Sequence, residues 1–327
     1  MITLGIESTA HTLSIGIARN NIILSNVIDT YSGGADGLIP RKMADHHSTV
    51  FSSVLSSALI EAKINLNQVD LVAFSQGPGI GAPLSVGVSA AKFLALKYNK
   101  KIIGVNHGYA HVKISEFCSK LKKPLVLYIS GGNSQILIED KDGFYSVLGE
   151  TLDIGIGNLF DSFARAIKME HAHGSALSKL AEGGKYIALP YSVKGMNLVF
   201  SGLLTAAEKL AQKHSHKDVA YSLMETSFAM TCEVTERALF LTKKKNLVVC
   251  GGVAQNKRLQ QMLKTMCDED GIKFGVGPDE YNRDNGAMIA YAGWLLYEKY
   301  GETKLEKCVP ITNYRIDRMN EILKGKF

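Results

Sequence analysis

The chain has 327 residues, of which 46% are hydrophobic and 21% are charged, with a formal net charge of +6. This composition supports a sizeable core, excludes a disordered chain and permits a polyanionic partner without requiring one. Five cysteines without a C-x-x-C pair fit a reduced, cytoplasmic compartment. We expect no signal peptide and no membrane contact, because the sequence has neither a leader pattern nor an apolar run of about 18 residues.

The first third of the chain predicts a three-stranded meander followed by alternating helices and strands. Residues 2–27 have the pattern strand, turn, strand, turn, strand, with Ser, Thr and Asn at the turns. The segments that we expect next are a helix at 41–64, a strand at 69–75, a helix at 84–98 and a strand at 102–105. A further helix is expected to begin at His107.

The same order of elements recurs later in the chain. Residues 124–149 predict a second meander. The segments expected after it are helices at 152–168 and 216–242, a strand at 247–250, a helix from Ala254, a strand near 272–276 and a helix from Asp284. This repeat predicts two α/β lobes of similar topology, and we place them at residues 1–118 and 119–327.

Two matching lobes that face each other would enclose a cleft. The turns at 7–9 and 130–133 would then occupy equivalent places, and backbone N–H groups of small residues can bind phosphate oxygens. Ordinary hairpin turns are the alternative. The glycine-rich segments at 75–83 and 251–252 also follow expected strands, where glycine permits the close approach of a ligand. Together the matched turns favour a nucleotide cleft.

A pair of histidines gives the clearest chemical signal. His107 and His111 stand four residues apart at the start of an expected helix, so their side chains share one face and can hold a metal ion. Gly108 occupies the position at which H-E-x-x-H proteases carry their glutamate, so a protease base is missing. Asp284 could complete a His–His–Asp set suited to iron or zinc. Solvated helix faces and a helix N-terminal charge are the alternatives.

Other polar residues support two interpretations each. Asp161 could bind a ribose diol or lie on a solvated helix face, and Asn256 could bind a ligand or cap a helix. Two basic clusters, Lys120 with Lys122–Lys123 and Lys243–Lys245, could contact RNA or form solvated surface. No RNA-binding module motif is present.

Eight motifs follow one another along nearly the whole chain. They are GIESTAHT at 5–12, GLIPRKMADHH at 37–47, SQGPGIGAPLSVG at 75–87, NHGYAH at 106–111, YISGGNSQ at 128–135, VKGMNLVFSGL at 193–203, GGVAQNKRL at 251–259 and DNGAMIA at 284–290. In this combination the chain resembles the universal threonylcarbamoyl-transferase family, which includes the catalytic subunit of the KEOPS complex and the bacterial TsaD proteins. The alanine-histidine pair of the first motif resembles the archaeal and eukaryotic branch.

The resemblance implies an α/β fold of the duplicated actin-like ATPase type (ASKHA, the group of sugar kinases, Hsp-seventy chaperones and actin), with a helical insert at about 152–215. It implies transfer of a threonylcarbamoyl group from threonylcarbamoyl-AMP to N6 of the adenosine 3′ of the anticodon, in tRNAs that read codons beginning with A. The partners it implies are tRNA, a small kinase-like ATPase, a dimerising subunit and a small regulatory subunit.

The resemblance also implies a site. The metal would be iron, or alternatively zinc, with His107, His111 and Asp284 as ligands and Tyr128 beside it. The adenine nucleotide would be lined by Tyr128, Ile129, Ser130, Gly131, Gly132, Asp161, Gly174, Ser178 and Asn256. The chain departs from the family pattern at 172–178, where Ser178 replaces a glutamate, and at Asn158, which also replaces a glutamate. An ATP-dependent kinase or ATPase of the same fold and a non-catalytic scaffold are the alternative functions.

Overall fold

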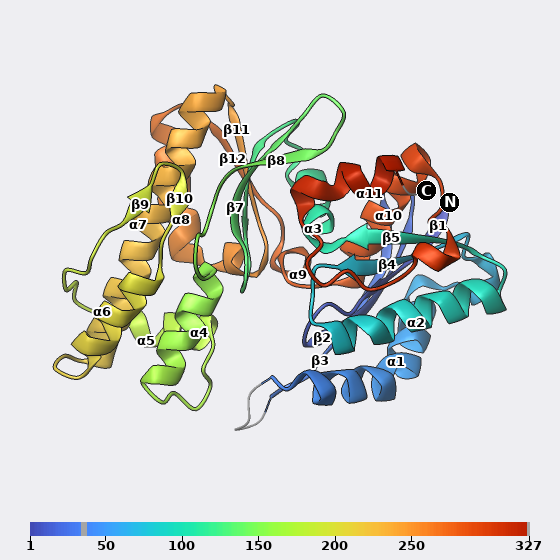
Figure 1. Cartoon of the computed structure of the whole chain (residues 1–327), viewed down its shortest axis with the longest axis horizontal. Coiled ribbons are helices and arrows are strands. Elements are labelled where there is room, and N and C mark those ends of the chain that lie inside the picture. The colour runs from blue at the N-terminus through green and yellow to red at the C-terminus, as the bar shows by residue number, and fades with distance from the viewer. Residues whose placement is uncertain (34–37, 326–327) are drawn as a thin grey trace. The chain divides into compact units, whose positions relative to one another are not determined.

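The computed structural model describes residues 1–33 and 38–325, so Gly37 of the second motif lies outside the described residues (Figure 1). The chain forms two compact units, one of Met1–Ile114 with Arg283–Phe327 and one of Ser115–Asn282. This division differs from the expected lobes, because the described C-terminal residues 283–325 belong to the first unit.

The first unit contains a five-stranded sheet of order β3-β2-β1-β4-β5. Its strands are β1 (Ile2–Glu7), β2 (Thr12–Arg19), β3 (Ile22–Thr30), β4 (Leu71–Gly77) and β5 (Lys101–Asn106). The meander β1–β3 is antiparallel, whereas β4 and β5 run parallel to β1. Strands β1, β4 and β5 are almost continuously buried, as expected of strands covered on both faces.

Helices cover both faces of this sheet. Helices α1 (Pro40–Ala62) and α2 (Gly81–Lys97) pack together on one face, and α10 (Gly286–Tyr300) lies on the other face, against β1 and β2 (Figure 1). The helix α3 (His107–Ser119) follows β5 directly, and α11 (Met319–Gly325) ends the described chain. Glycines allow the close approach of α10, because a Cβ at Gly16 would lie 2.1 Å from the backbone nitrogen of Ala287. This packing positions the residues that precede α10.

The second unit repeats the topology of the first. Its sheet has the order β12-β11-β6-β7-β8, which is the first sheet read in reverse, with a meander β6–β8 and two parallel strands beside β6. The strands are β6 (Leu125–Ile129), β7 (Ser134–Glu139), β8 (Tyr145–Glu150), β11 (Asn246–Cys250) and β12 (Lys273–Val276). The expected duplicated α/β fold is therefore confirmed.

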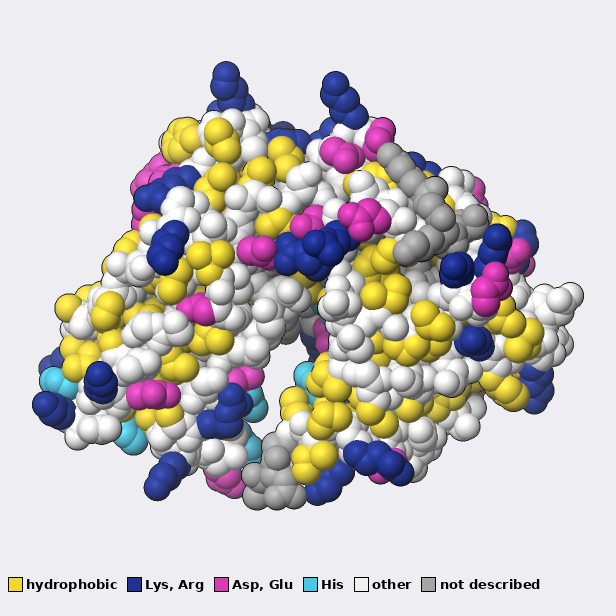
Figure 2. Space-filling view, viewed as in Figure 1, with side chains coloured by type: hydrophobic (Ala, Val, Ile, Leu, Met, Phe, Trp, Pro, Cys, Tyr) yellow, Lys and Arg dark blue, Asp and Glu magenta, His cyan; other side chains and the backbone are white. Residues whose placement is uncertain are grey.

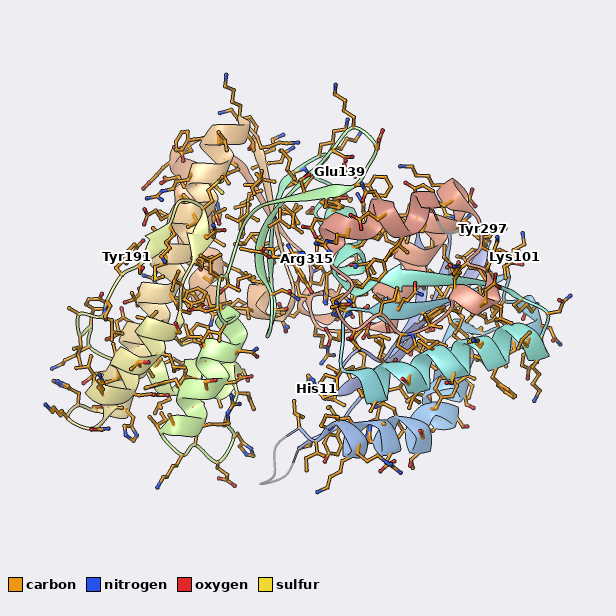
Figure 3. The ribbon with its side chains drawn as sticks, viewed as in Figure 1. His11, Lys101, Glu139, Tyr191, Tyr297 and Arg315 are labelled. Carbon is orange, nitrogen blue, oxygen red and sulfur yellow. The ribbon has the colours of Figure 1, made fainter. Side chains whose placement is uncertain are left out.

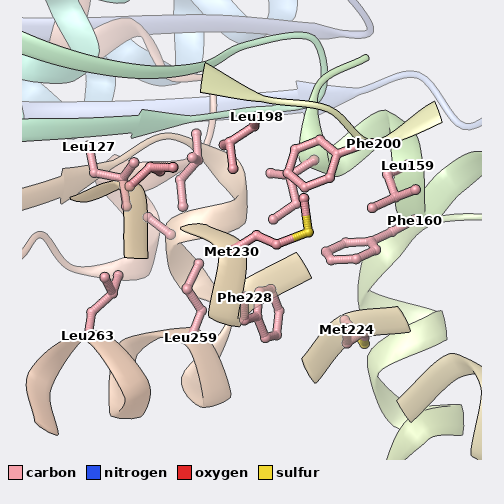
Figure 4. Close-up of a cluster of buried hydrophobic side chains, with 14 of the residues drawn as sticks. Leu127, Leu159, Phe160, Leu198, Phe200, Met224, Phe228, Met230, Leu259 and Leu263 are labelled. Carbon is pink, nitrogen blue, oxygen red and sulfur yellow. The ribbon is translucent and has the colours of Figure 1, made fainter. Parts of the chain in front are cut away.

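The remaining elements of the second unit are mostly helices. They are α4 (Ile156–Ala166), α5 (Gly174–Ala181), the hairpin β9 (Val193–Lys194) with β10 (Asn197–Leu198), α6 (Ser201–Ala211), α7 (His216–Thr242), α8 (Lys257–Glu269) and α9 (Asp279–Asn282). Their core contains Phe160 and Phe228, whose rings meet edge to face (Figure 4). None of the described helices has both the length and the apolar run needed to cross a membrane.

Candidate metal centre

His107 and His111 lie in the first two turns of α3, immediately after β5. Strand β5 is buried from Ile102 onward, so it fixes the position at which the helix begins. The two imidazole rings meet edge to face with their centroids 4.6 Å apart, and both side chains are buried. The expected helix and the shared face of the two histidines are confirmed.

Asp284 completes the group from the other end of the first unit. Its Oδ1 lies 3.2 Å from Nε2 of His111 and 3.4 Å from Nε2 of His107. We expected Asp284 to begin the last long helix, but α10 begins at Gly286 and Asn285 is its N-cap, with its side chain accepting from the N–H of Met288. Asp284 therefore precedes the cap, and its carboxylate faces the two histidines.

The three side chains have the donor set of a metal site. One atom from each of His107, His111 and Asp284 lies within 4.8 Å of the others. Two imidazole nitrogens and one carboxylate oxygen suit iron or zinc, and three protein ligands leave coordination positions for a substrate. The residues present thus fit a metal ion.

A fourth residue, Glu7, supports this group. It ends β1 and is completely buried, and its Oε2 lies 2.9 Å from Nδ1 of His107. Its Oε1 accepts hydrogen bonds from the backbone N–H and the hydroxyl of Thr9. A carboxylate on the far ring nitrogen orients a ligating histidine and directs Nε2 to the metal. This role of Glu7 was not predicted. The sequence does contain an indication of it, because Glu7 is the one charged residue of a strand that is otherwise apolar or uncharged, and buried acids are rare unless they are paired.

The charges of the group determine which histidine carries a proton. Burial lowers the pKa of His107, but Glu7 and Asp284 outweigh it and raise that pKa well above the ordinary value. The pKa of His111 is lowered, chiefly by burial. Burial acts to raise the pKa of Asp284, but the charge of His107 and hydrogen bonds from both histidines hold it well below its usual range. These interactions favour the protonated form of His107 over that of His111 at neutral pH.

This protonation state predicts a proton release on metal binding. Because the metal needs a lone pair on His107, binding at pH 7 should release about one proton per ion. Calorimetric titration with Zn²⁺ in buffers of different ionisation enthalpy measures this number. The affinity should weaken further as the pH falls, since the proton competes for the same imidazole. Binding without buffer-dependent heat would contradict this protonation state.

The residues expected at the adenine nucleotide lie in the second unit. Tyr128 and Ile129 are buried at the end of β6, and the loop Ser130–Gly132 follows them. This loop packs against the start of α4, where Ser130 O and Gly131 O accept hydrogen bonds from the backbone of Gly157 and Asn158 at 3.3 and 2.9 Å. Tyr128 belongs to the second unit and the metal group to the first, so its place beside a metal stays a prediction.

The other predicted nucleotide residues meet in pairs. Asp161 on α4 accepts from the backbone N–H of Gly174 at 2.8 Å, and Asn256 donates to the hydroxyl of Ser178 at 3.2 Å. Asn256 also caps α8, as its alternative interpretation predicts. Strands β6 and β11 are paired in parallel up to Tyr128 and Cys250, so the loops that follow them leave the same edge of the sheet. Ligands of open α/β sheets bind at this edge.

The chain is similar to known proteins along nearly its whole length. The family model described as TsaD, tRNA N6-adenosine threonylcarbamoyltransferase, matches residues 21–291. The tRNA N6-adenosine threonylcarbamoyltransferase of Thermococcus sibiricus is 49% identical over 98% of this chain and 99% of its own length. A probable bifunctional tRNA threonylcarbamoyladenosine biosynthesis protein of Methanothermobacter thermautotrophicus is 43% identical over 98% of this chain, which spans 60% of that relative.

Solved structures share the fold at low sequence identity. HypF of T. kodakarensis superposes with a TM-score of 0.64 at 14% identity, covering 91% of this chain and 48% of HypF. Component A of the (R)-2-hydroxyglutaryl-CoA dehydratase of Acidaminococcus fermentans superposes with a TM-score of 0.57 at 16% identity, covering 91% of this chain and 98% of that one. These similarities show the fold alone.

Proposed function

The chain belongs to the TsaD family of tRNA N6-adenosine threonylcarbamoyltransferases, and we propose that it transfers a threonylcarbamoyl group from threonylcarbamoyl-AMP to N6 of the adenosine 3′ of the anticodon. The observation that carries this proposal is the His107–His111–Asp284 group, in which both histidines are buried, supported by Glu7. An ATP-dependent kinase of this fold would not need such a group, and a non-catalytic scaffold would not need the open coordination positions that three protein ligands leave. The substrate tRNAs would be those that read codons beginning with A.

The residues of the first unit would prepare the carbonyl for attack. His107, His111 and Asp284 would hold iron, or alternatively zinc, which when bound supplies a Lewis acid that polarises a carbonyl oxygen. Glu7 keeps the His107 ring oriented, and burial of the two histidines limits access of water. Gly108 suits this chemistry, because the nucleophile is the amine of adenosine and no residue has to activate water.

The residues of the second unit would bind the adenylate. Backbone N–H groups of the loop Ser130–Gly132 would hold phosphate oxygens of the leaving AMP, and Asp161 and Asn256 would contact its nucleoside. Asn256 already bonds Ser178, which replaces the family's glutamate, so this pair would present one amide and one hydroxyl to the nucleotide. As partners we propose tRNA and the kinase-like, dimerising and regulatory subunits of a KEOPS-type complex.

The test is formation of N6-threonylcarbamoyladenosine by the full chain together with these subunits. We expect the modified nucleoside, detected by mass spectrometry of digested tRNA, when threonylcarbamoyl-AMP and a metal ion are supplied. A chelator should abolish the product, and added Fe²⁺ or Zn²⁺ should restore it. A tRNA with guanosine in place of the target adenosine is the matched control. A complete mixture that yields no modified nucleoside would refute the proposal.

A further inference from the structure

An extended segment, residues 184–195, is attached along one stripe of α7. The side chains of Asp218 and Ser222 accept the backbone N–H groups of Lys185 and Ile187, each at 2.7 Å. Farther along the helix, Arg237 donates to the carbonyl of Gly195 at 2.6 Å. We call this segment the strap; from 184 to 192 it has no regular secondary structure.

The strap holds two tyrosine rings at the surface. Tyr186 and Tyr191 are 57% and 49% exposed, yet the hydroxyl of each is bonded to α7. The Tyr186 hydroxyl lies 3.2 Å from Oγ1 of Thr226, and the Tyr191 hydroxyl donates to Glu233 at 2.5 Å. The two anchors are seven residues apart, about 10 Å along the helix axis. Figure 3 shows Tyr191 beside α7, on the side of the helix away from the sheet. Rings anchored in this way lose little freedom when a ligand stacks on them.

The same helix leads from the strap to a basic surface. Phe240 and Leu241, each 64% exposed, follow Arg237 by one turn, and Lys243–Lys245 follow them. Lys244 donates to the carbonyl of Lys123 at 2.8 Å, and Asn246 donates to the carbonyl of Lys122 at 2.9 Å. The two basic clusters, more than a hundred residues apart in sequence, therefore lie together.

Strand register explains this meeting. Leu125 of β6, Leu247 of β11 and Phe274 of β12 are neighbours across the sheet. The lysines that precede β6 and β11 therefore emerge at the same edge as Lys273, the first residue of β12. The lysine cluster consists of the exposed residues Lys120, Lys122, Lys123, Lys243, Lys245 and Lys273. Within residues 1–33 and 38–325, no carboxylate forms an ion pair with any of the six. Figure 2 shows basic side chains projecting where α7 ends near β11.

We propose that this face of the second unit, from Tyr186 and Tyr191 to the lysine cluster, binds the tRNA. The tyrosine rings stack on unpaired bases, and the lysines contact phosphates of the adjoining helix. Anchored exposed aromatic rings beside unpaired cations are the pattern of single-stranded RNA recognition. From Thr226 to Lys243 the face extends about 25 Å along α7, room for a loop and the start of its stem. The identity of the RNA rests on the proposed function.

The first experiment removes stacking without removing charge. Binding of fluorescent tRNA to the full chain is measured between about 50 and 300 mM salt. Tyr186→Leu with Tyr191→Leu should weaken binding by about thirtyfold or more, which is about fivefold or more for each stacked base, and should leave the salt dependence unchanged. Tyr186→Phe with Tyr191→Phe keeps the rings and should stay within about threefold of wild type. Phe93→Leu, an exposed ring of the first unit, is the control.

The second experiment removes charge without removing stacking. Binding weakens as salt rises, so the slope of log affinity against log salt is negative. Lys122→Gln with Lys245→Gln should make this slope shallower by about 1.5, because two phosphate contacts are lost. Both lysines have ordinary backbone angles, so the change leaves the turns intact. Lys209→Gln with Lys213→Gln removes the same charge from exposed lysines of the same unit and should leave the slope unchanged.

The outcomes separate this proposal from the proposed function. A wild-type slope in the Lys122/Lys245 variant, or wild-type affinity in the leucine variant, would overturn the RNA face even if the modified nucleoside is formed. Normal tRNA affinity with loss of a protein subunit from the complex would also overturn it and reassign the face to that subunit. RNA binding that depends on the face, without nucleoside modification, would support the face and refute the transferase proposal.

Discussion

Replacement of His111 by alanine is expected to remove the metal ion and to reduce formation of N6-threonylcarbamoyladenosine by at least about 100-fold. Loss of a residue that merely supports a ligand costs 10–100-fold in metal affinity or activity, and His111 is itself a predicted ligand. It is completely buried and its Nε2 lies 3.2 Å from Asp284. Metal content by mass spectrometry and the yield of modified nucleoside measure the two effects in one preparation.

The control for this variant is His214→Ala, which removes an exposed histidine from the connection between α6 and α7. It should retain both the metal and the activity. His111→Asn keeps a polar side chain in the buried position, so a loss of metal in this second variant cannot be assigned to an empty cavity. If His111→Ala retained its metal and its product yield, the ligand assignment would be wrong.

The arrangement of His107 and His111 could be predicted from the sequence, because the two residues are only four positions apart in one helix. A buried strand followed by a helix start determines where His107 and His111 point, and helical periodicity then places them on one face. The two meanders were predictable for the same reason, since hairpin turns and alternation are read over a few residues. The confirmed duplication of the α/β fold followed from these local patterns, whereas the order of the strands within each sheet was not predicted.

The rest of the site depends on contacts between distant parts of the chain. Asp284 and His111 are 173 residues apart, and they meet only because α10 returns to the first sheet. No local sequence pattern indicates that α10 packs on the first sheet. The expected lobe of residues 119–327 therefore included a segment, from Arg283 onward, that belongs to the first unit. Glu7 was missed for a similar reason, because its partner His107 is 100 residues away. The proximity of the two basic clusters could not be predicted either, because it depends on the register of β6, β11 and β12 in the sheet.

Replacement of Gly286 by alanine is expected to destabilise the protein by about 3 kcal/mol and to weaken metal binding at the same time. A Cβ at this position would lie 2.2 Å from the backbone nitrogen of Gly16, and backbone cannot move aside as a flexible side chain can. Alanine favours helix over glycine by about 1 kcal/mol, which is too little to offset the clash. Gly286 also donates its N–H to the hydroxyl of Ser14 at 2.8 Å, a contact that a displaced α10 would lose.

The link to the metal distinguishes this prediction from ordinary overpacking. Asp284 stands two residues before Gly286, so displacement of α10 from β2 moves a ligand away from His107 and His111. Urea unfolding measures the stability, and calorimetric titration with Zn²⁺ measures the affinity of the folded variant. Gly202→Ala in α6, where a Cβ meets no atom within 4 Å, should keep the affinity and raise the stability by up to about 1 kcal/mol. Wild-type stability in Gly286→Ala would show that α10 does not pack against β2 as closely as the structure indicates. Unchanged Zn²⁺ affinity in a destabilised variant would show that the position of Asp284 does not depend on α10.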